Sequence, residues 1–311
     1  MASPTRLPDI PMGTFQMKSA LALALVLIVA ASASARTSSA IAHDPPVDRA
    51  APASSMAVRI ESHGQLMNGV VYLPAGSGPH PVVVLLHGFP GNEQNLDLAQ
   101  AMRRAGWAVV TFHYRGTWGS GGAFSFDGAV EDGAAVLAWV RDPARAKQLQ
   151  AKRIAVVGHS MGGYVGAELC AAHPELVGCV LIAPWDLSAD QPLLAAQSAV
   201  ERDRTAATEF DDIDGRISGM SAREVVEALA TQGGKWSLQK TAPGLARLRT
   251  LVVIASRDAD DCKAISLLPA LKQHGAKALR VETVETDHSF NDRRIALEGL
   301  VLNWLEELPV K

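Results

Sequence analysis

A serine flanked by glycines lies where an apolar segment meets a helix-like segment. Residues 154–157 read Ile-Ala-Val-Val, and Gly158-His159-Ser160-Met161-Gly162-Gly163 follows them directly. A G-x-S-x-G pattern at a strand-to-helix junction requires a very sharp turn, in which the serine backbone is strained and larger residues at the glycine positions would collide with their neighbours. An ordinary helix N-cap is the alternative role for Ser160. The surrounding glycines favour a nucleophile whose hydroxyl projects away from the sheet.

Two polar residues follow later predicted strands in an order that suits this serine. The segment 251–256 runs into Asp258, and the segment 279–284 is followed shortly by His288. The carboxyl ends of strands in an open parallel sheet gather functional groups at one edge. The order Ser160, Asp258, His288 therefore predicts a nucleophile, an acid that orients the imidazole, and a base that accepts the serine proton.

A second glycine-containing loop predicts the groups that would stabilise negative charge. Residues 81–86 read as a buried strand, and His87-Gly88-Phe89-Pro90-Gly91-Asn92 follows. Acyl transfer creates an oxyanion, and losing one preorganised backbone donor costs about 100- to 1000-fold in rate. We expect the backbone N–H groups of Phe89 and Met161 to act as these donors, with Gly88 allowing a close backbone approach.

Together these segments resemble the α/β-hydrolase superfamily, and within it the prolyl-oligopeptidase and dienelactone-hydrolase type of catalytic domain. The resemblance covers residues 57–308, and its motifs are His87 to Gly91, Tyr114 to Ser120, Gly158 to Gly163, Asp258, and Asp287 to Phe290. It implies an α/β-hydrolase fold: a mostly parallel sheet with helices on both faces and a small helical cap inserted above the serine. The sequence departs from many relatives in having Ala255-Ser256-Arg257-Asp258 where they have Gly-x-x-Asp.

Other polar residues near these motifs offer alternatives. Some relatives carry the acid one strand earlier, which would place it at Asp186, after the apolar segment 180–183. Asp287 is interpreted as a turn residue or a solvated charge. A cradle for phosphate is conceivable in the glycine-rich loop, but no Gly-Lys-Ser/Thr follows it, which favours a tight loop beside the site. The glycines of that loop are Gly116, Gly119, Gly121 and Gly122.

Strand and helix signals alternate along residues 57–311, which we interpret as one hydrolase domain. The alternation is interrupted at about residues 186–249, where helices are predicted over 190–208 and 221–230. Long uninterrupted loops are uncommon without a function, so this insertion is predicted to be the helical cap. Three of its apolar residues are expected to pack in a core, with the pocket wall as the alternative: Met220, Leu229 and Trp236.

The N-terminus is different in kind. Lys18 precedes the apolar run 20–30, and Ala33-Ser34-Ala35 follows. A positive charge, a short apolar core and an A-x-A site are typical of a secretory signal peptide, which is too short to span a membrane comfortably. We therefore predict a signal peptide over residues 1–35 that is cleaved after Ala35, with Ala42 as the alternative site.

Processing of this kind would give a periplasmic or secreted protein without a stable membrane span. Met17 would make a more typical start, in which case residues 1–16 are an extension. Residues 36–56, rich in Ala, Ser and Pro, are expected to form a mobile linker. An uncleaved signal anchor is the alternative.

Composition excludes some classes of partner. The net charge is −3, and no basic stripe with interleaved aromatic residues is present, so no nucleic-acid partner is expected. The three cysteines, Cys170, Cys179 and Cys262, lack the spacing of a metal site, and neither a metal nor a cofactor is predicted. Cys170 and Cys179 either form a disulfide or are small buried hydrophobic residues.

The leading hypothesis is a secreted serine hydrolase that cleaves carboxylic esters through an acyl-enzyme. An aminopeptidase or acyl-peptidase of the prolyl-oligopeptidase type is the alternative, although no carboxylate pair for a peptide amine is evident in the sequence. A non-catalytic binding module is the third hypothesis. The expected partner is a small-molecule ester or a peptide, and the sequence does not indicate an oligomeric state.

Overall fold

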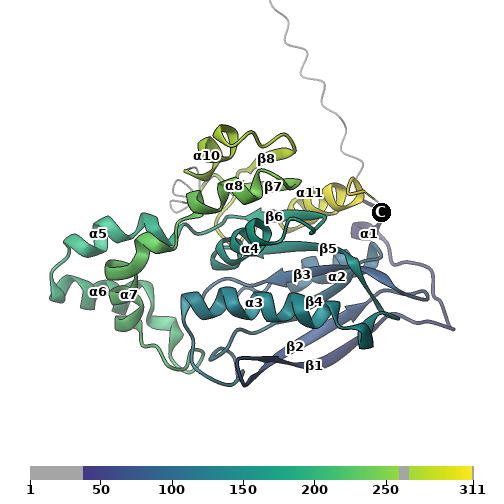
Figure 1. Cartoon of the computed structure of the whole chain (residues 1–311), viewed down its shortest axis with the longest axis horizontal. Helices are drawn as coiled ribbons and strands as arrows, with labels where there is room; N and C mark the ends of the chain where they lie inside the picture. Colours follow the sequence, from purple (N-terminus) through teal and green to yellow (C-terminus); the bar gives the residue numbers. More distant parts are fainter. Residues whose placement is uncertain (1–37, 259–265, 310–311) are drawn as a thin grey trace, which may run out of the picture. The chain divides into compact units, whose positions relative to one another are not determined.

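The computed structural model describes residues 38–258 and 266–309, which belong to one compact unit over residues 36–311. Its centre is an eight-stranded sheet with the order β1-β2-β4-β3-β5-β6-β7-β8 and helices on both faces (Figure 1). The strands are β1 (Ser54–Ser62), β2 (Gln65–Leu73), β3 (His80–Leu86), β4 (Ala108–Phe112), β5 (Leu149–His159), β6 (Gly178–Ile182), β7 (Thr250–Ala255) and β8 (Leu279–Val284).

The direction of strand pairing divides the sheet into two parts. β1 pairs antiparallel with β2, and β2 pairs antiparallel with β4. From β4 through β3, β5, β6 and β7 to β8, every pairing is parallel. The carboxyl ends of β3, β5, β7 and β8 therefore meet at one edge, where the predicted functional residues follow. The predicted fold class is confirmed.

β3 shows how the sequence produces a core on each face of the sheet. Val82 and Val84 join one buried hydrophobic cluster, whereas Val83 and Leu85 join the other. Successive side chains of a strand point to opposite faces, so an uninterrupted apolar strand suits a sheet covered on both sides. Burying each aliphatic side chain contributes about 1.5–3 kcal/mol to folding.

The helices that cover the sheet come mostly from the connections between parallel strands. α2 (Leu96–Arg104) and α11 (Arg294–Glu306) contribute to one buried cluster, and α3 (Phe126–Arg141), α4 (Met161–Ala172) and α10 (Leu267–Gln273) contribute to the other. A short 3-10 helix, η1 (Pro143–Arg145), precedes β5. α3 begins at Phe126, because the Ser125 side chain caps it by accepting a hydrogen bond from Gly128 N at 3.0 Å.

Between β6 and β7 the chain forms a group of short helices. Figure 1 shows α5, α6 and α7 side by side, beyond the end of the sheet. The elements are η2 (Leu187–Ala189), α5 (Gln191–Ala196), α6 (Ala199–Glu209), η3 (Asp211–Ile213), α7 (Ala222–Gln232), η4 (Gly233–Lys235), η5 (Leu238–Thr241) and α8 (Ala242–Leu245). We refer to residues 186–249 as the cap.

One helix predicted in the cap is in fact two. The chain leaves the helical conformation at Gln197, where ψ is 143°, and Ser198 then caps α6. The Ser198 side chain accepts a hydrogen bond from Glu201 N at 3.3 Å, and Glu201 Oε2 accepts one from Ser198 N at 2.7 Å. This reciprocal capping box ends the continuous helix predicted over 190–208.

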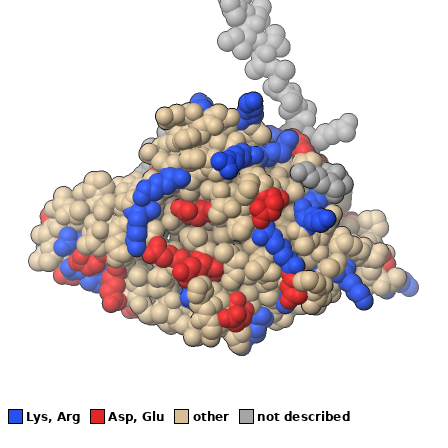
Figure 2. All heavy atoms as spheres, viewed as in Figure 1, with Lys and Arg blue, Asp and Glu red and all other residues tan. Residues whose placement is uncertain are grey.

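The first described residues contact the domain. α1 (Ser39–Ala42) packs near α2 and α11, and Ser38 Oγ donates a hydrogen bond to Glu306 Oε1 at 2.8 Å. The mobile linker over 36–56 remains a prediction, as do the domain boundaries. Within the described residues, no helix has the length and apolar character needed to cross a bilayer. Figure 2 shows acidic and basic side chains interspersed over one face of the molecule.

Candidate active site

Ser160 lies in the turn between β5 and α4, with φ 57° and ψ −122°. A positive φ is uncommon for a residue with a side chain and indicates backbone strain. The flanking glycines make this turn possible. A Cβ on Gly158 would lie 2.0 Å from Gly162 O, and a Cβ on Gly162 would lie 2.2 Å from Leu86 O. The turn is thus sharp and strained, as the glycine pattern predicts.

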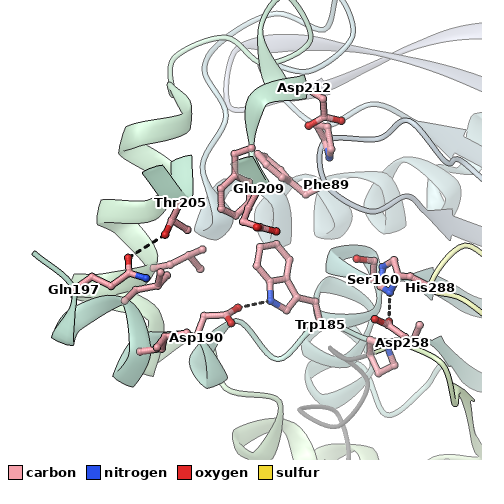
Figure 3. Close-up of a pocket in the computed structure, with 17 residues that line it drawn as sticks. Phe89, Ser160, Trp185, Asp190, Gln197, Thr205, Glu209, Asp212, Asp258 and His288 are labelled. Atoms are coloured by element: carbon pink, nitrogen blue, oxygen red, sulfur yellow. Dashed lines mark hydrogen bonds and ion pairs between the residues drawn. The ribbon is translucent and has the colours of Figure 1, made fainter. Parts of the chain in front are cut away.

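The structure brings His288 and Asp258 into direct contact. His288 follows β8 and Asp258 follows β7, and His288 Nδ1 is hydrogen-bonded to Asp258 Oδ2. Because an ionised carboxylate only accepts hydrogen bonds, this contact places the imidazole proton on Nδ1 and makes Nε2 the nitrogen that can accept a proton. Both residues line the same cavity as Ser160, and Figure 3 shows Ser160 next to the His288 ring.

Asp186, the alternative acid, has different partners. Its Oδ1 accepts hydrogen bonds from Ser188 Oγ at 2.6 Å and Leu238 N at 3.3 Å, and its Oδ2 accepts one from Ser266 Oγ at 3.0 Å. The carboxylate therefore joins the start of the cap to two later segments. Asp258, and not Asp186, is the residue hydrogen-bonded to His288.

Asp287 also has a local structural role. Its two carboxylate oxygens accept hydrogen bonds from Asn291 N and Asn291 Nδ2, each at 2.9 Å. This arrangement closes the turn that carries His288 toward α11. The interpretation of Asp287 as a turn residue is confirmed.

The loop after β3 approaches the serine closely. A Cβ added to Gly88 would lie 3.0 Å from Ser160 Cβ, so only glycine fits there without displacement. Phe89 lines the cavity, and Met161 occupies the first position of α4, where a backbone N–H has no acceptor within the helix. Both predicted oxyanion donors thus lie in segments adjacent to Ser160.

Hydrogen bonds from the next loop hold this backbone in place. Tyr114 Oη donates to His87 O at 3.2 Å, and Trp118 Nε1 donates to Pro90 O at 2.7 Å. In the glycine-rich loop that contains Trp118, Gly116 N donates a hydrogen bond to Gly121 O at 3.0 Å, and Trp118 N donates one to Arg216 O of the cap at 3.0 Å. These contacts match the tight loop expected beside the site.

Two buried histidines next to the site are uncharged at neutral pH. Burial lowers the pKa of His159 to about 4 and that of His87 to about 3. His159 Nε2 lies 2.9 Å from the carbonyl oxygen of His288, and since a carbonyl only accepts, this nitrogen carries the proton.

A cavity of about 420 Å³ opens above Ser160. Its walls come from the loop after β3, the segment after β6 and the cap (Figure 3). Leu229 lines this cavity while only 1% exposed, whereas Trp236 and Met220 pack in or against the hydrophobic core. The expectation of core packing is confirmed for all three, and Leu229 also contributes to the pocket wall.

Three carboxylates of the cavity wall were not predicted from the sequence. Asp190, Glu209 and Asp212 all come from the cap and line the cavity. The acidic residues in the segment 211–214 are visible in the sequence, but the direction in which their side chains point depends on how the cap helices pack. The lack of an evident carboxylate pair in the sequence therefore does not extend to the folded pocket.

The described residues hold no group of three His, Cys, Asp or Glu side chains arranged to bind a metal ion. Cys170 and Cys179 are buried free thiols, and burial raises the pKa of Cys170. Cys262 and the predicted signal peptide lie outside the described residues.

Residues 83–297, more than half of the chain, match the sequence profile of the Alpha/beta hydrolase family, and the chain belongs to that family. The chain is similar to the lysophosphatidylserine lipase ABHD12 of Danio rerio, with 31% identity over 93 residues, which are 29% of this chain and 23% of that protein. The chain spans less than half the length of the curated relatives it matches.

Solved structures with the same fold include hydrolases. The esterase Pf2001 of Pyrococcus furiosus superposes with a TM-score of 0.59 at 17% identity, covering 86% of this chain and 99% of its own. A Klebsiella pneumoniae protein assigned as a dienelactone hydrolase superposes with a TM-score of 0.57 at 15% identity, covering 82% and 99%. At these identities the similarity shows the fold, and it confirms the resemblance to dienelactone hydrolases.

Proposed function

We propose that this α/β-hydrolase is a serine hydrolase that cleaves carboxylic esters, with Ser160, His288 and Asp258 as its catalytic triad. The observation that carries the proposal is that a strained Ser160 and an Asp258-bonded His288 line one cavity. The esterase among the structural neighbours supports the choice of substrate class.

In the proposed reaction, Ser160 Oγ forms a bond to the acyl carbon while His288 Nε2 takes the hydroxyl proton. The N–H groups of Phe89 and Met161 stabilise the oxyanion. The ester C–O bond then breaks, and His288 returns the proton to the departing alcohol. Water repeats these steps on the acyl-enzyme, releasing the carboxylic acid and free Ser160, while Asp258 stabilises the imidazolium.

Replacing the nucleophile tests this mechanism. Ser160→Ala should lower kcat for p-nitrophenyl butyrate by about 10⁴-fold or more, because losing a triad nucleophile has an effect of that size. A fluorophosphonate probe should label Ser160 in the parent protein, as read by peptide mass spectrometry. Ser77→Ala, at an exposed position before β3 and so at the opposite end of that strand from Phe89, serves as the control and should retain full activity.

Residual Ser160→Ala activity within tenfold of the parent would contradict the triad mechanism. Comparing acetyl, butyryl and octanoyl esters with an aminoacyl-anilide separates the two enzymatic hypotheses. Anilide turnover exceeding ester turnover would favour the aminopeptidase alternative. Absence of both labelling and turnover would favour the binding module.

We also propose that the protein is exported and cleaved after Ala35. The support is the charged, apolar and A-x-A sequence pattern of residues 18–35. Intact-mass measurement of the protein recovered from a periplasmic or secreted fraction should give a chain that begins at Arg36, or at His43 for the alternative site. A mass that retains residues 18–35 would disprove cleavage.

A further inference from the structure

The wall of the catalytic cavity has a marked charge asymmetry. Its described lining residues include four carboxylates and no lysine or arginine. One carboxylate, Asp258, is paired with His288. The other three, Asp190, Glu209 and Asp212, stand on the cap side and face the substrate space (Figure 3).

Two of these three carboxylates have polar partners in the pocket wall. Asp190 Oδ2 accepts a hydrogen bond from Trp185 Nε1 at 2.8 Å, and Asp212 Oδ2 accepts one from Asn92 Nδ2. The Asn92 amide is uncharged, so it holds the Asp212 carboxylate in place without neutralising its charge. Asp190 also fixes the orientation of the Trp185 ring.

Glu209, the last residue of α6, differs from them. Its Oε1 accepts a hydrogen bond from the neighbouring Thr208 hydroxyl at 3.3 Å. Within the described residues, no lysine or arginine forms an ion pair with it. Figure 3 shows its carboxylate extending from the cap toward the ring of Trp185.

Two arginines of the cap form hydrogen bonds outside the cavity lining. Arg202 donates to Glu227 Oε1 at 3.1 Å and to the carbonyl of Gln197 at 2.9 Å. Arg216 donates to the carbonyl of Asp212 and lies over the ring of Trp118. Neither arginine is among the described lining residues, so neither offers a positive charge to the substrate beside Glu209 and Asp212.

Aromatic rings line the same cavity. Phe89, Trp185 and Phe210 are all lining residues, and the Phe89 and Phe210 ring centroids lie 6.1 Å apart at 69°. Aromatic faces attract an organic cation through the negative charge density above the ring, and proteins use such faces to bind ammonium groups. A carboxylate directed at an aromatic ring offers an ammonium group two favourable contacts at once.

We propose that the cavity selects esters that carry an ammonium group, which lies between the Glu209 carboxylate and the rings of Phe89, Trp185 and Phe210. The inference rests on the proposed ester hydrolysis and specifies its substrate class. It predicts that esters carrying an extra carboxylate are poor substrates, because the carboxylates of Glu209 and Asp212 would repel them.

Three matched p-nitrophenyl esters test the inference, with acyl chains ending in trimethylammonium, the isosteric tert-butyl group, or a carboxylate. A second matched set carries the same three groups on the alcohol side. In at least one set, the parent protein should hydrolyse the ammonium ester about tenfold faster in kcat/KM than the tert-butyl ester, and the carboxylate ester slowest. High salt should reduce this preference, since ions screen charges in an open cavity.

Glu209→Gln keeps the shape of the side chain and removes its charge. It should lower the ammonium preference about 3- to 10-fold, the size expected for one charge pair in a largely hydrated site. The preference is the ratio of kcat/KM for the ammonium ester to kcat/KM for the tert-butyl ester, so a general change in turnover cancels. Asp211→Asn makes the same change in net charge at an exposed cap residue outside the cavity lining, and it should leave the preference unchanged.

The outcomes separate this inference from the proposed function. If the tert-butyl esters are hydrolysed and Ser160 is labelled, but neither set shows an ammonium preference, the ammonium site is wrong and the esterase stands. Equal loss of preference in Glu209→Gln and Asp211→Asn would also overturn the role of Glu209. If no ester is hydrolysed and Ser160 is not labelled, both proposals fail.

Discussion

His159 connects the serine turn to the loop that carries His288. It immediately precedes Ser160, its ring is buried, and its ring centroid lies 4.9 Å from that of His288. The hydrogen bond from His159 Nε2 to the His288 carbonyl spans 129 residues of sequence. The hydrogen bond of His159 goes to the backbone of His288 and not to a reacting atom. We therefore interpret His159 as a positioning residue that holds the His288 loop beside the serine.

Removing this donor should slow the chemical step. His159→Phe should lower kcat for p-nitrophenyl butyrate about 10- to 100-fold with KM within about twofold, because a displacement of about 1 Å at a reacting group has effects of this size. His159→Gln retains an N–H donor and should recover most of the loss. Active-site titration with fluorophosphonate distinguishes a slower enzyme from a smaller folded fraction; equal activity of the two variants per titrated site would refute the positioning role.

At the scale of helices and strands, the sequence was informative where a feature depends on local chemistry. Ser160, Asp258 and His288 follow apolar strands, and strand ends in a parallel sheet converge by geometry, so their shared cavity was predictable. The split of the first cap helix was also within reach, because Ser198-x-x-Glu201 is a capping-box pattern inside the predicted helix.

Other features depend on packing between elements that no local pattern encodes. Glu209 and Asp212 face the cavity because α6 and η3 turn toward the loop after β3, where Asn92 meets Asp212. The choice of Asp258 over Asp186 likewise needed the partners that only the folded chain shows, namely Ser188, Leu238 and Ser266 around Asp186. The sequence therefore predicted the candidate catalytic residues more completely than the residues that line the pocket.

At the scale of the whole molecule, the site and the stability of the fold depend on the same buried histidines. His87, directly after β3, and His159, at the end of β5, are both buried, and desolvation lowers both pKa values far below the usual 6.5. An unfolded chain would bind protons at these positions at a pH where the folded protein does not. Folding stability must then increase with pH across this range.

The folded protein should lose stability as the pH falls from 6.5 toward 4. Above pH 6.5 both histidines are neutral in either state, and as the pH falls toward 4 the unfolded state gains protons first, so the folded state loses stability. At pH 4.5 we expect each of the two histidines to lower the free energy of unfolding by about 2 kcal/mol or more, since one pKa unit corresponds to about 1.4 kcal/mol. Urea unfolding of the parent and of His159→Gln at pH 7.5 and pH 4.5 measures the difference.

His159→Gln cannot titrate, so its loss of stability between these two pH values should be smaller by about 2 kcal/mol. His274→Asn, at an exposed position, is the matched histidine replacement with which His159→Gln is compared. Because carboxylates titrate in all three proteins, their contribution cancels in the comparison. Identical pH dependence in the parent and His159→Gln would mean that His159 binds a proton as readily in the folded protein as in the unfolded chain, which would contradict its lowered pKa.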